Sequence, residues 1–218
     1  MKFESYTLSS EIKANLEQLG FKRPTDIQFK AIPNILNGED VLAVAQTGTG
    51  KTGAFAIPII HKVQENKSFK KELGIQALIM VPTRELALQI TKVFHDLGRN
   101  TKVRTISVFG GVDQDGQKES LDRGIDILVA TLGRMFDLLN QKSIDLRNLK
   151  TLILDEADQM LALGFYKDIK DVLHNIPEDR QTLFFSATIN DEIKKLAYSL
   201  VTNPIRIQLS PKDPVSKN

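Results

Sequence analysis

The sequence predicts an α/β protein with a mostly parallel central sheet and helices on both faces. Short apolar runs alternate with segments of helical periodicity along most of the chain. The runs are almost continuously apolar, which is typical of parallel strands that are buried on both faces. A glycine-rich turn of the kind that binds phosphate follows the first run. With 218 residues, the chain is long enough for one sizeable core and short for two domains.

Two helices are expected before the first strand. Apolar residues recur at helical spacing over residues 8–20, where Ser9 can cap the helix and Gly20 ends it. Thr25 and Gln28 then have the spacing of a capping box at the start of a second helix. On these residues alone, Gln28 serves as a capping partner.

The rest of the chain supplies the sheet and its covering helices. Strands are expected at 41–44, 75–81, 103–109, 125–130, 151–154, 181–185 and 205–209, and helices at 84–97, 134–140, 166–174 and 191–200. Residues 62–73 are polar and charged, so an exposed loop is expected there. The tail, 210–218, mixes Pro, Lys, Asp and Ser and is expected to be a linker, which leaves 1–209 as one domain.

Charge and cysteine content narrow the class of protein. The net charge is only +2, so a nucleic acid would be bound by a few placed groups rather than by a broad basic field. The absence of cysteine excludes disulfides and thiolate metal sites and suits a reducing cytoplasm. No secretion signal or bilayer-spanning apolar stretch is found, so we expect a soluble, cytoplasmic protein.

The segment Ala45–Thr52 has the pattern of a loop that cradles phosphate. Gly48 and Gly50 lack Cβ, so the backbone can curl and direct successive N–H groups at one anion. Lys51 would add a cationic donor for the β- and γ-phosphates, and Thr52 a hydroxyl for Mg²⁺. The alternative is an ordinary strand-to-helix turn with a surface lysine.

Ala45 departs from the usual pattern, which begins with glycine. Alanine is the smallest substitute, so the loop keeps its shape if this position needs no positive φ. The other residues that we expect to contact the nucleotide here are Gln46, Thr47 and Thr49.

Three acids follow the apolar run 151–154. Acids at the carboxyl end of a parallel strand face the crevice where α/β sheets bind ligands, so Asp155 would share a ligand with Lys51. Asp155 is placed to hold Mg²⁺, and Glu156 to orient or deprotonate an attacking water. Asp158 is better suited to hydrogen bonding with a neighbouring loop. The alternative is a solvated helix start, because acids favour the first turn.

Together these residues resemble the DEAD-box family of ATP-dependent RNA helicases, specifically its first RecA-like domain. The resemblance extends from Phe3 to about Leu209, with the motifs in family order. The sequence Asp-Glu-Ala-Asp at 155–158 is the namesake, and in that family the phosphate loop commonly begins with alanine. The resemblance implies a RecA-like fold, ATP and Mg²⁺ as ligands, and RNA as partner.

Residues 21–28 are similar to the family's Q motif, which reads adenine. The resemblance implies that Phe21 stacks on the base, that Gln28 hydrogen-bonds its edge and that Arg23 belongs to the same nucleotide site. A side-chain amide can pair with adenine N6 and N7, and capping does not exclude this role.

Three further segments resemble the family's RNA-facing motifs, and each follows a predicted strand. Their residues are Pro82, Thr83 and Arg84; Gly110 and Gly111; and Thr131, Gly133 and Arg134. Helix-start N–H groups, glycine backbone and the two arginines suit phosphate oxygens, which predicts little base preference. Read separately, each segment is an ordinary turn. The third has Leu132 where the family usually has proline, which relaxes a fixed φ.

Ser186 and Thr188 match the motif that couples the nucleotide site to RNA in this family, with Asp158 as partner. The alternative is that they cap a helix that begins near Asp191. The family's second RecA-like domain, which carries arginine fingers, is not recognisable here. We therefore expect this chain to be monomeric and nearly inactive alone.

Two wider questions remain open at the level of sequence. The opening Phe-x-x-Tyr and the run Ala-Val-Ala-Gln at 43–46 resemble the bacterial RhlE-type subgroup. The competing functions are a P-loop ATPase that works on DNA or protein, and a module that binds nucleotide and RNA without catalysis.

Overall fold

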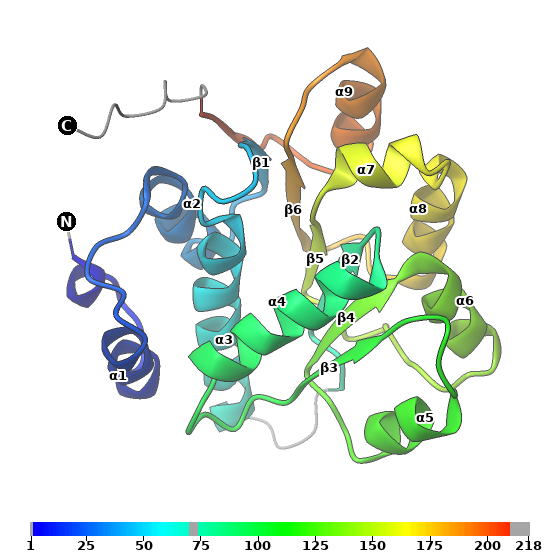
Figure 1. Ribbon diagram of the computed structural model, residues 1–218, viewed down its shortest axis with the longest axis horizontal. Coiled ribbons are helices and arrows are strands. Elements are labelled where there is room, and N and C mark those ends of the chain that lie inside the picture. Colours follow the sequence, from blue (N-terminus) through cyan, green and yellow to red (C-terminus); the bar gives the residue numbers. More distant parts are fainter. Residues whose placement is uncertain (1, 70–73, 210–218) are drawn as a thin grey trace.

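A computed structural model of the chain describes residues 2–69 and 74–209 (Figure 1). The strands are β1 (Val41–Val44), β2 (Ala77–Val81), β3 (Thr105–Val108), β4 (Ile127–Thr131), β5 (Thr151–Leu154), β6 (Gln181–Ser186) and β7 (Ile205–Gln208). The α-helices are α1 (Ser10–Gln18), α2 (Asp26–Leu36), α3 (Lys51–Phe69), α4 (Arg84–Leu97), α5 (Asp115–Asp122), α6 (Leu132–Asn140), α7 (Ala157–Ala162), α8 (Tyr166–Val172) and α9 (Asp191–Tyr198). Two 3₁₀ turns, η1 (Phe3–Ser5) and η2 (Leu173–Asn175), complete the set.

The seven strands form one sheet in the order β3-β4-β2-β5-β6-β1-β7. Every pairing in it is parallel. Each predicted apolar run overlaps one strand, so the predicted parallel α/β sheet is confirmed.

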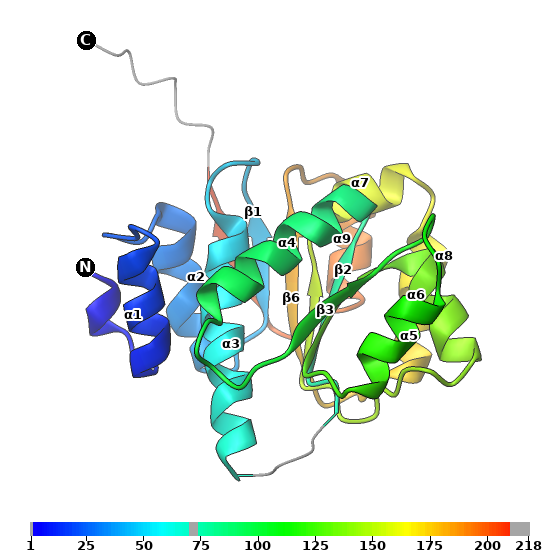
Figure 2. The ribbon, with the colours of Figure 1, turned by 60° about the horizontal axis from the view of Figure 1, so that its bottom comes forward.

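Alternate residues of the five inner strands pack into two separate cores, one on each face of the sheet. In β6, Leu183 and Phe185 belong to the first core and Phe184 to the second. Helices α1–α4 contribute to the first core and α5–α9 to the second, together with residues of the connecting segments. Figure 1 shows α1, α2 and α3 on one side of the sheet, with α6 and α8 on the other, and Figure 2 shows the same layers after a turn. Burial on both faces explains why the inner strands are almost continuously apolar.

The loop predicted for residues 62–73 was wrong for most of that segment, because α3 continues to Phe69. Residues 70–73 lie outside the described part of the chain, as does the predicted linker at 210–218. The short helix α5 was not predicted, and α7 was expected only as the alternative, a helix start at the acids after β5.

The polar side chains of α3 have buried partners, which explains the error. Lys62 Nζ donates to Gln181 Oε1 at 2.7 Å, and Lys67 Nζ forms an ion pair with Asp126 Oδ2 at 2.8 Å. A charged residue that reaches a polar partner beneath the helix does not mark a solvated loop.

The strand order brings three loops together at the carboxyl edge of the sheet. After β1 the chain crosses over two strand positions to reach β2, and β5 and β6 later fill the gap. The segments that follow β1, β5 and β6 are therefore neighbours. Ligands in open α/β sheets bind at such a place.

Candidate functional site

The loop after β1 has the conformation that a phosphate cradle needs. Gly48 and Gly50 have φ angles of +82° and +93°, which a side chain would strain. Ala45 is absent from the positive-φ residues, and its N–H extends the ladder by donating to the carbonyl oxygen of Ser186 at 3.0 Å. Alanine at the first position is therefore compatible with the loop, as the sequence required.

Lys51 is the first residue of α3, and it is 6% exposed. Its Nζ atom is buried and has no hydrogen-bond partner among the described residues. Lysine is almost never fully buried without a partner, because desolvation of an ammonium is costly. A buried, unpaired cation beside a glycine-rich loop is the donor set that a phosphate group would complete, which argues against an ordinary turn with a surface lysine.

Asp155 follows β5 and is 2% exposed, so it is not part of a solvated helix start. The pKa of Asp155 is raised to about 6, chiefly by burial and also by the charge of Glu156, while the Lys51 ammonium opposes this rise. Asp155 and Lys51 are thus electrostatic neighbours on the same edge of the sheet, as predicted. A magnesium ion at this carboxylate would supply the positive charge that the buried group lacks.

Glu156 has a left-handed backbone, with φ 54° and ψ 48°, at the N-cap of α7. Its N–H donates to Asp155 Oδ1 at 3.0 Å. A non-glycine residue in this region costs on the order of 1–2 kcal/mol, and such strain is concentrated at functional sites. The strained backbone therefore agrees with a functional role for Glu156, the residue that we expect to orient or deprotonate the attacking water.

Asp158 lies in the first turn of α7 and joins it to the loop after β6. Its carboxylate accepts from the backbone N–H groups of Ala187 and Thr188, at 3.3 and 3.1 Å, and from the Thr188 hydroxyl at 3.0 Å. Partial burial alone would raise the pKa of Asp158, but these hydrogen bonds outweigh it and leave the pKa below its ordinary value. The pairing matches the expected partnership, and the helix-cap alternative is wrong because Asn190 caps α9.

Gln28, in the first turn of α2, links the capping box to the phosphate loop. Its Oε1 accepts from the Thr25 N–H at 3.0 Å, and its Nε2 donates to the carbonyl oxygen of Gly50 at 3.2 Å. A Cβ at Gly53 would lie 2.7 Å from Nε2, so glycine is needed for this close approach. The cap is confirmed, and the amide also touches the predicted phosphate site.

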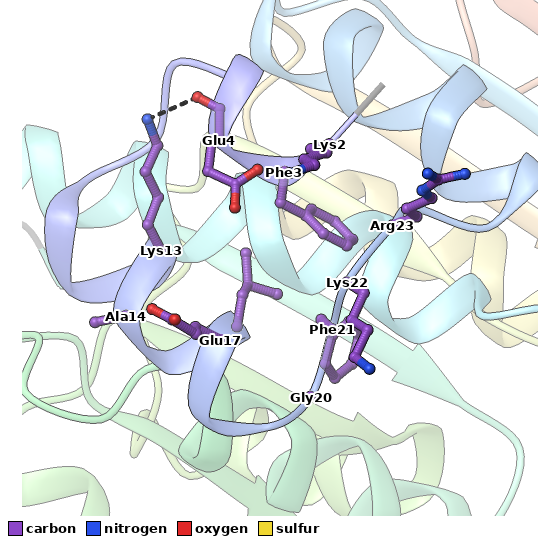
Figure 3. A pocket seen from close by; sticks show the side chains of 11 residues that line it. Lys2, Phe3, Glu4, Lys13, Ala14, Glu17, Gly20, Phe21, Lys22 and Arg23 are labelled. Atoms are coloured by element: carbon purple, nitrogen blue, oxygen red, sulfur yellow. Dashed lines mark hydrogen bonds between the residues drawn. The ribbon is translucent and has the colours of Figure 1, made fainter.

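Phe21 and Arg23 line a cavity of about 630 Å³ beside η1 and α1 (Figure 3). The Phe3 ring meets the Phe21 ring edge-on, with centroids 6.0 Å apart. The remaining lining residues are Lys2, Glu4, Lys13, Ala14, Leu16, Glu17, Gly20 and Lys22. Three residues of the predicted adenine segment, Phe21, Lys22 and Arg23, therefore border one cavity, while Gln28 lies at the phosphate loop. The role of each toward adenine stays a prediction.

The three segments predicted to face RNA follow β2, β3 and β4, which are neighbours in the sheet. Gly110, Gly111 and Gly133 are exposed, as is Arg84, whereas Thr131 and Arg134 are half-buried. Pro82 is buried, and the Thr83 hydroxyl caps α4 by accepting from the Leu86 N–H. These three segments lie next to the segments that follow β5, β6 and β1, along the same edge of the sheet. Their contacts with RNA stay predictions.

Leu132 replaces the family's proline at the first position of α6. It is 2% exposed and packs in the second core, so burial holds the helix start in place of a fixed φ.

Sequence reasoning missed two residues that tie the RNA-facing segments together, Phe109 and Gln117. The guanidinium of Arg84 lies over the Phe109 ring, 4.9 Å from its centroid, and Gln117 contacts both Phe109 and Arg134. Gln117 belongs to α5, whose charged and glycine-containing sequence gave no apolar periodicity. The role of Gln117 can therefore be seen only from its contacts in the folded chain.

Within residues 2–69 and 74–209, no group of three or more metal-ligating side chains is present, and no helix is long and apolar enough to cross a membrane. The candidate magnesium site thus rests on Asp155 and Thr52. This is typical of Mg²⁺, which keeps several waters and is held by one or two carboxylates plus substrate phosphates.

Comparison with known proteins gives a family that covers most of the chain. Residues 25–196 match the family described as DEAD/DEAH box helicase. The chain is 39% identical, over 216 residues, to the DEAD-box ATP-dependent RNA helicase CshA of Bacillus cereus, covering 99% of this chain and 40% of that protein. It is 42% identical, over 213 residues, to the CshA protein of Streptococcus pneumoniae, covering 98% of this chain and 40% of that protein.

A solved structure agrees with the fold. The crystal structure of a DEAD box protein from the hyperthermophile Methanococcus jannaschii superposes with a TM-score of 0.88 and 40% identity, covering 95% of this chain and 56% of that one. The chain thus has the RecA-like architecture, and it spans about two fifths of the length of the CshA relatives that it matches. These relatives carry the CshA name, so the RhlE-type assignment stays a prediction.

Proposed function

Since this chain belongs to the DEAD/DEAH box helicase family, we propose that it is the first RecA-like domain of an ATP-dependent RNA helicase. The observation that carries the proposal is the buried, unpaired ammonium of Lys51 next to the buried carboxylate of Asp155. A triphosphate with its magnesium would compensate both charges at once. We also propose that the chain is monomeric alone and works in the cytoplasm.

The residues of the edge have distinct roles in this proposal. Lys51 and the N–H groups of residues 46–50 would hold the β- and γ-phosphates, and Thr52 and Asp155 would hold Mg²⁺. When bound, Mg²⁺ neutralises the charge that develops on the phosphates. Glu156 would accept a proton from the attacking water. Its left-handed backbone sets the direction in which the side chain leaves the main chain.

The adenine end would be read by the segment that follows α1. Phe21 offers an aromatic face at the rim of the cavity in Figure 3, and Gln28 offers amide groups beside the phosphate loop. Gln28 keeps one free N–H and one free lone pair after its two hydrogen bonds. Replacing Phe21 or Gln28 by alanine should therefore weaken the binding of ATP more than the binding of a non-adenine triphosphate.

RNA would bind along the row of loops after β2, β3 and β4, mainly through phosphate contacts. The row continues without a break into the loops after β5, β6 and β1. One closure of a second RecA-like domain over this edge could therefore sense ATP and RNA together, and the bound strand would be bent so that it cannot remain paired. Asp158 and Thr188 join the loops after β5 and β6, and this contact would couple the nucleotide site to the loops proposed to bind RNA.

The decisive experiment measures ATP hydrolysis by the full-length protein with RNA, with DNA and with neither. We expect stimulation by RNA alone. Glu156→Gln in the same protein should keep ATP binding and lose turnover by ~10²-fold or more. Stimulation by DNA would favour a general P-loop ATPase, and the absence of hydrolysis under all conditions would favour a module that only binds.

A further inference from the structure

The loop that follows β3 is held at its start by a side chain from α5. Gln117 Nε2 donates to the carbonyl oxygen of Phe109 at 3.1 Å, directly before Gly110. The other end of the same amide, Oε1, accepts from Arg134 Nη1 at 3.0 Å. One carboxamide thus bridges the end of β3 and the first turn of α6.

Arg134 holds the same loop from its other side. Its Nη2 donates to the carbonyl oxygen of Val112 at 2.9 Å. Gly110 and Gly111 therefore lie between two residues whose carbonyl groups are both bound, Phe109 by Gln117 and Val112 by Arg134. The stacking of Arg84 on the Phe109 ring adds the loop after β2 to the same set of contacts.

The two glycines have no packing of their own that could hold the loop. Both are exposed, and a Cβ built at either would meet no atom within 4 Å. Gly111 also has a φ of +78°, a conformation that costs glycine little and that leaves the chain locally free. The position of this backbone must therefore be set by the residues on either side.

Only a carboxamide of this length can make both contacts of Gln117. The Phe109 carbonyl needs a donor and the Arg134 guanidinium needs an acceptor, which also fixes the orientation of the amide. Glutamate could accept but not donate, and lysine could donate but not accept.

We propose that Gln117 is a positioning residue for RNA, holding the glycine loop and Arg134 as one unit so that their phosphate-binding groups are pre-aligned. The inference rests on the proposed function, because it assumes that these loops bind RNA. Arg134 gives two of its five N–H donors to the protein and keeps three for a phosphate. Pre-alignment should lower the cost of ordering the site on binding.

The first test uses full-length protein carrying Gln117→Ala, Gln117→Met or Gln117→Glu. Each variant loses the donor to Phe109, and we expect the RNA concentration that half-saturates ATP hydrolysis to rise about 5–30-fold. Turnover at saturating RNA and the KM for ATP should stay within about twofold of wild type. Gln114→Ala is the matched control, because Gln114 is the N-cap residue of the same helix and, among the described residues, its side chain hydrogen-bonds only with Gln141. Its RNA dependence should match wild type.

The methionine variant separates hydrogen bonding from packing, because it keeps the length of glutamine without its polar groups. Wild-type RNA dependence of Gln117→Met would overturn the proposal. In addition, the effects of Gln117→Ala and Arg134→Ala should be clearly less than additive, because the first residue acts through the second. Full additivity would contradict that relation.

A measurement on the 218-residue chain tests the bridge formed by Gln117 without RNA. Backbone NMR order parameters of residues 110–112 should fall clearly in Gln117→Met and stay unchanged in Gln114→Ala. If the order parameters do not change, the proposed bridge is wrong whatever the protein binds. If they fall while the wild-type full-length protein ignores RNA, the proposed function fails and the proposed role of Gln117 in RNA binding fails with it.

Discussion

Two carboxylates three residues apart, Asp155 and Asp158, have pKa values shifted in opposite directions. Asp155 is buried beside a single cation, which leaves its pKa raised to about 6. Asp158 receives hydrogen bonds from the loop after β6, which leave its pKa lowered. The ionised carboxylate of Asp155 thus destabilises the metal-free fold, whereas that of Asp158 stabilises it.

We expect Asp155→Asn to stabilise the metal-free chain above pH 6. The folded-state pKa of Asp155 exceeds its unfolded value, so its contribution is most favourable below about pH 4 and is lost as the pH rises through about 6. The shift is roughly 2 units, so the gain in unfolding free energy at pH 8 should be on the order of 2–3 kcal/mol. Urea unfolding in EDTA between pH 4 and pH 8 measures it.

Asp158→Asn is the control, because its effect has the opposite sign. A lowered folded-state pKa supplies stability above the unfolded value of about 4, and that stability is lost as the pH falls. The variant should therefore be less stable than wild type at pH 7 and similar to it in acid. If the unfolding free energies of Asp155→Asn and wild type differed by the same amount at pH 4 and pH 8, Asp155 would not have the raised pKa assigned to it.

Glu156 combines strain with a proposed chemical role, and two substitutions separate them. Glu156→Gly removes both the carboxylate and the cost of the left-handed backbone, whereas Glu156→Ala removes the carboxylate alone. We expect both to lose hydrolysis, and only glycine to raise the unfolding free energy, by about 0.5–1 kcal/mol after its entropy cost. Equal thermal stability of the two variants would show that no strain is stored at this position.

At the scale of elements, the junction of α2 and α3 is as closely packed as any part of the site. Gly53 is in the first turn of α3, and its missing side chain leaves room for the Gln28 amide. A helix would ordinarily gain up to about 1 kcal/mol from alanine in place of glycine. Here the new Cβ would instead lie 2.7 Å from Gln28 Nε2, so the end of that flexible side chain must move.

Gly53→Ala should therefore leave the chain folded while it disturbs adenine recognition. We expect the ratio of GTP to ATP dissociation constants, measured by calorimetry, to fall at least threefold in the variant. Gly116→Ala, in α5, is the control, because its Cβ would meet no atom within 4 Å and should affect only helix stability. Unchanged discrimination in Gly53→Ala would mean that the displaced Gln28 amide does not read the base.

Strands were predictable from the sequence because burial on both faces leaves few polar positions in the inner strands, as β1 and β2 show. The end of α3 was not, because Lys62 and Lys67 find partners only once distant segments pack beneath them. α7 was foreseen only as the alternative for the acids after β5, a helix start. What the sequence did not show is the left-handed backbone of Glu156 at which that helix begins.

The candidate site divides in the same way. Lys51 and Asp155 could be placed on one edge from the rule that parallel strands present their carboxyl ends together. The bridge from Gln117 to Arg134 could not, since it joins two helices whose relative position depends on the whole sheet. Local spacing predicts what each loop can bind, whereas packing decides which loops move together.

At the scale of the molecule, all six motif-bearing loops lie on one edge, and catalysis should need a second domain that closes over it. The chain spans about two fifths of the length of its CshA relatives. An arginine finger contributes on the order of 10³–10⁵ in rate to related phosphoryl transfers. We therefore expect the 218-residue chain to hydrolyse ATP at least ~10³-fold more slowly than the full-length protein, both at saturating ATP with RNA present.

A control is needed because low activity could also reflect damage to the fold. The 218-residue chain should still be stabilised against heat by Mg-ATP, since the phosphate loop and Asp155 are both within it, and Lys51→Ala should abolish that stabilisation. Turnover near the full-length rate in the 218-residue chain would mean that this edge is complete without a partner domain. Loss of both turnover and ligand-induced stabilisation would instead place the fault in the nucleotide site itself, because no domain closure is needed for Lys51 to meet a phosphate.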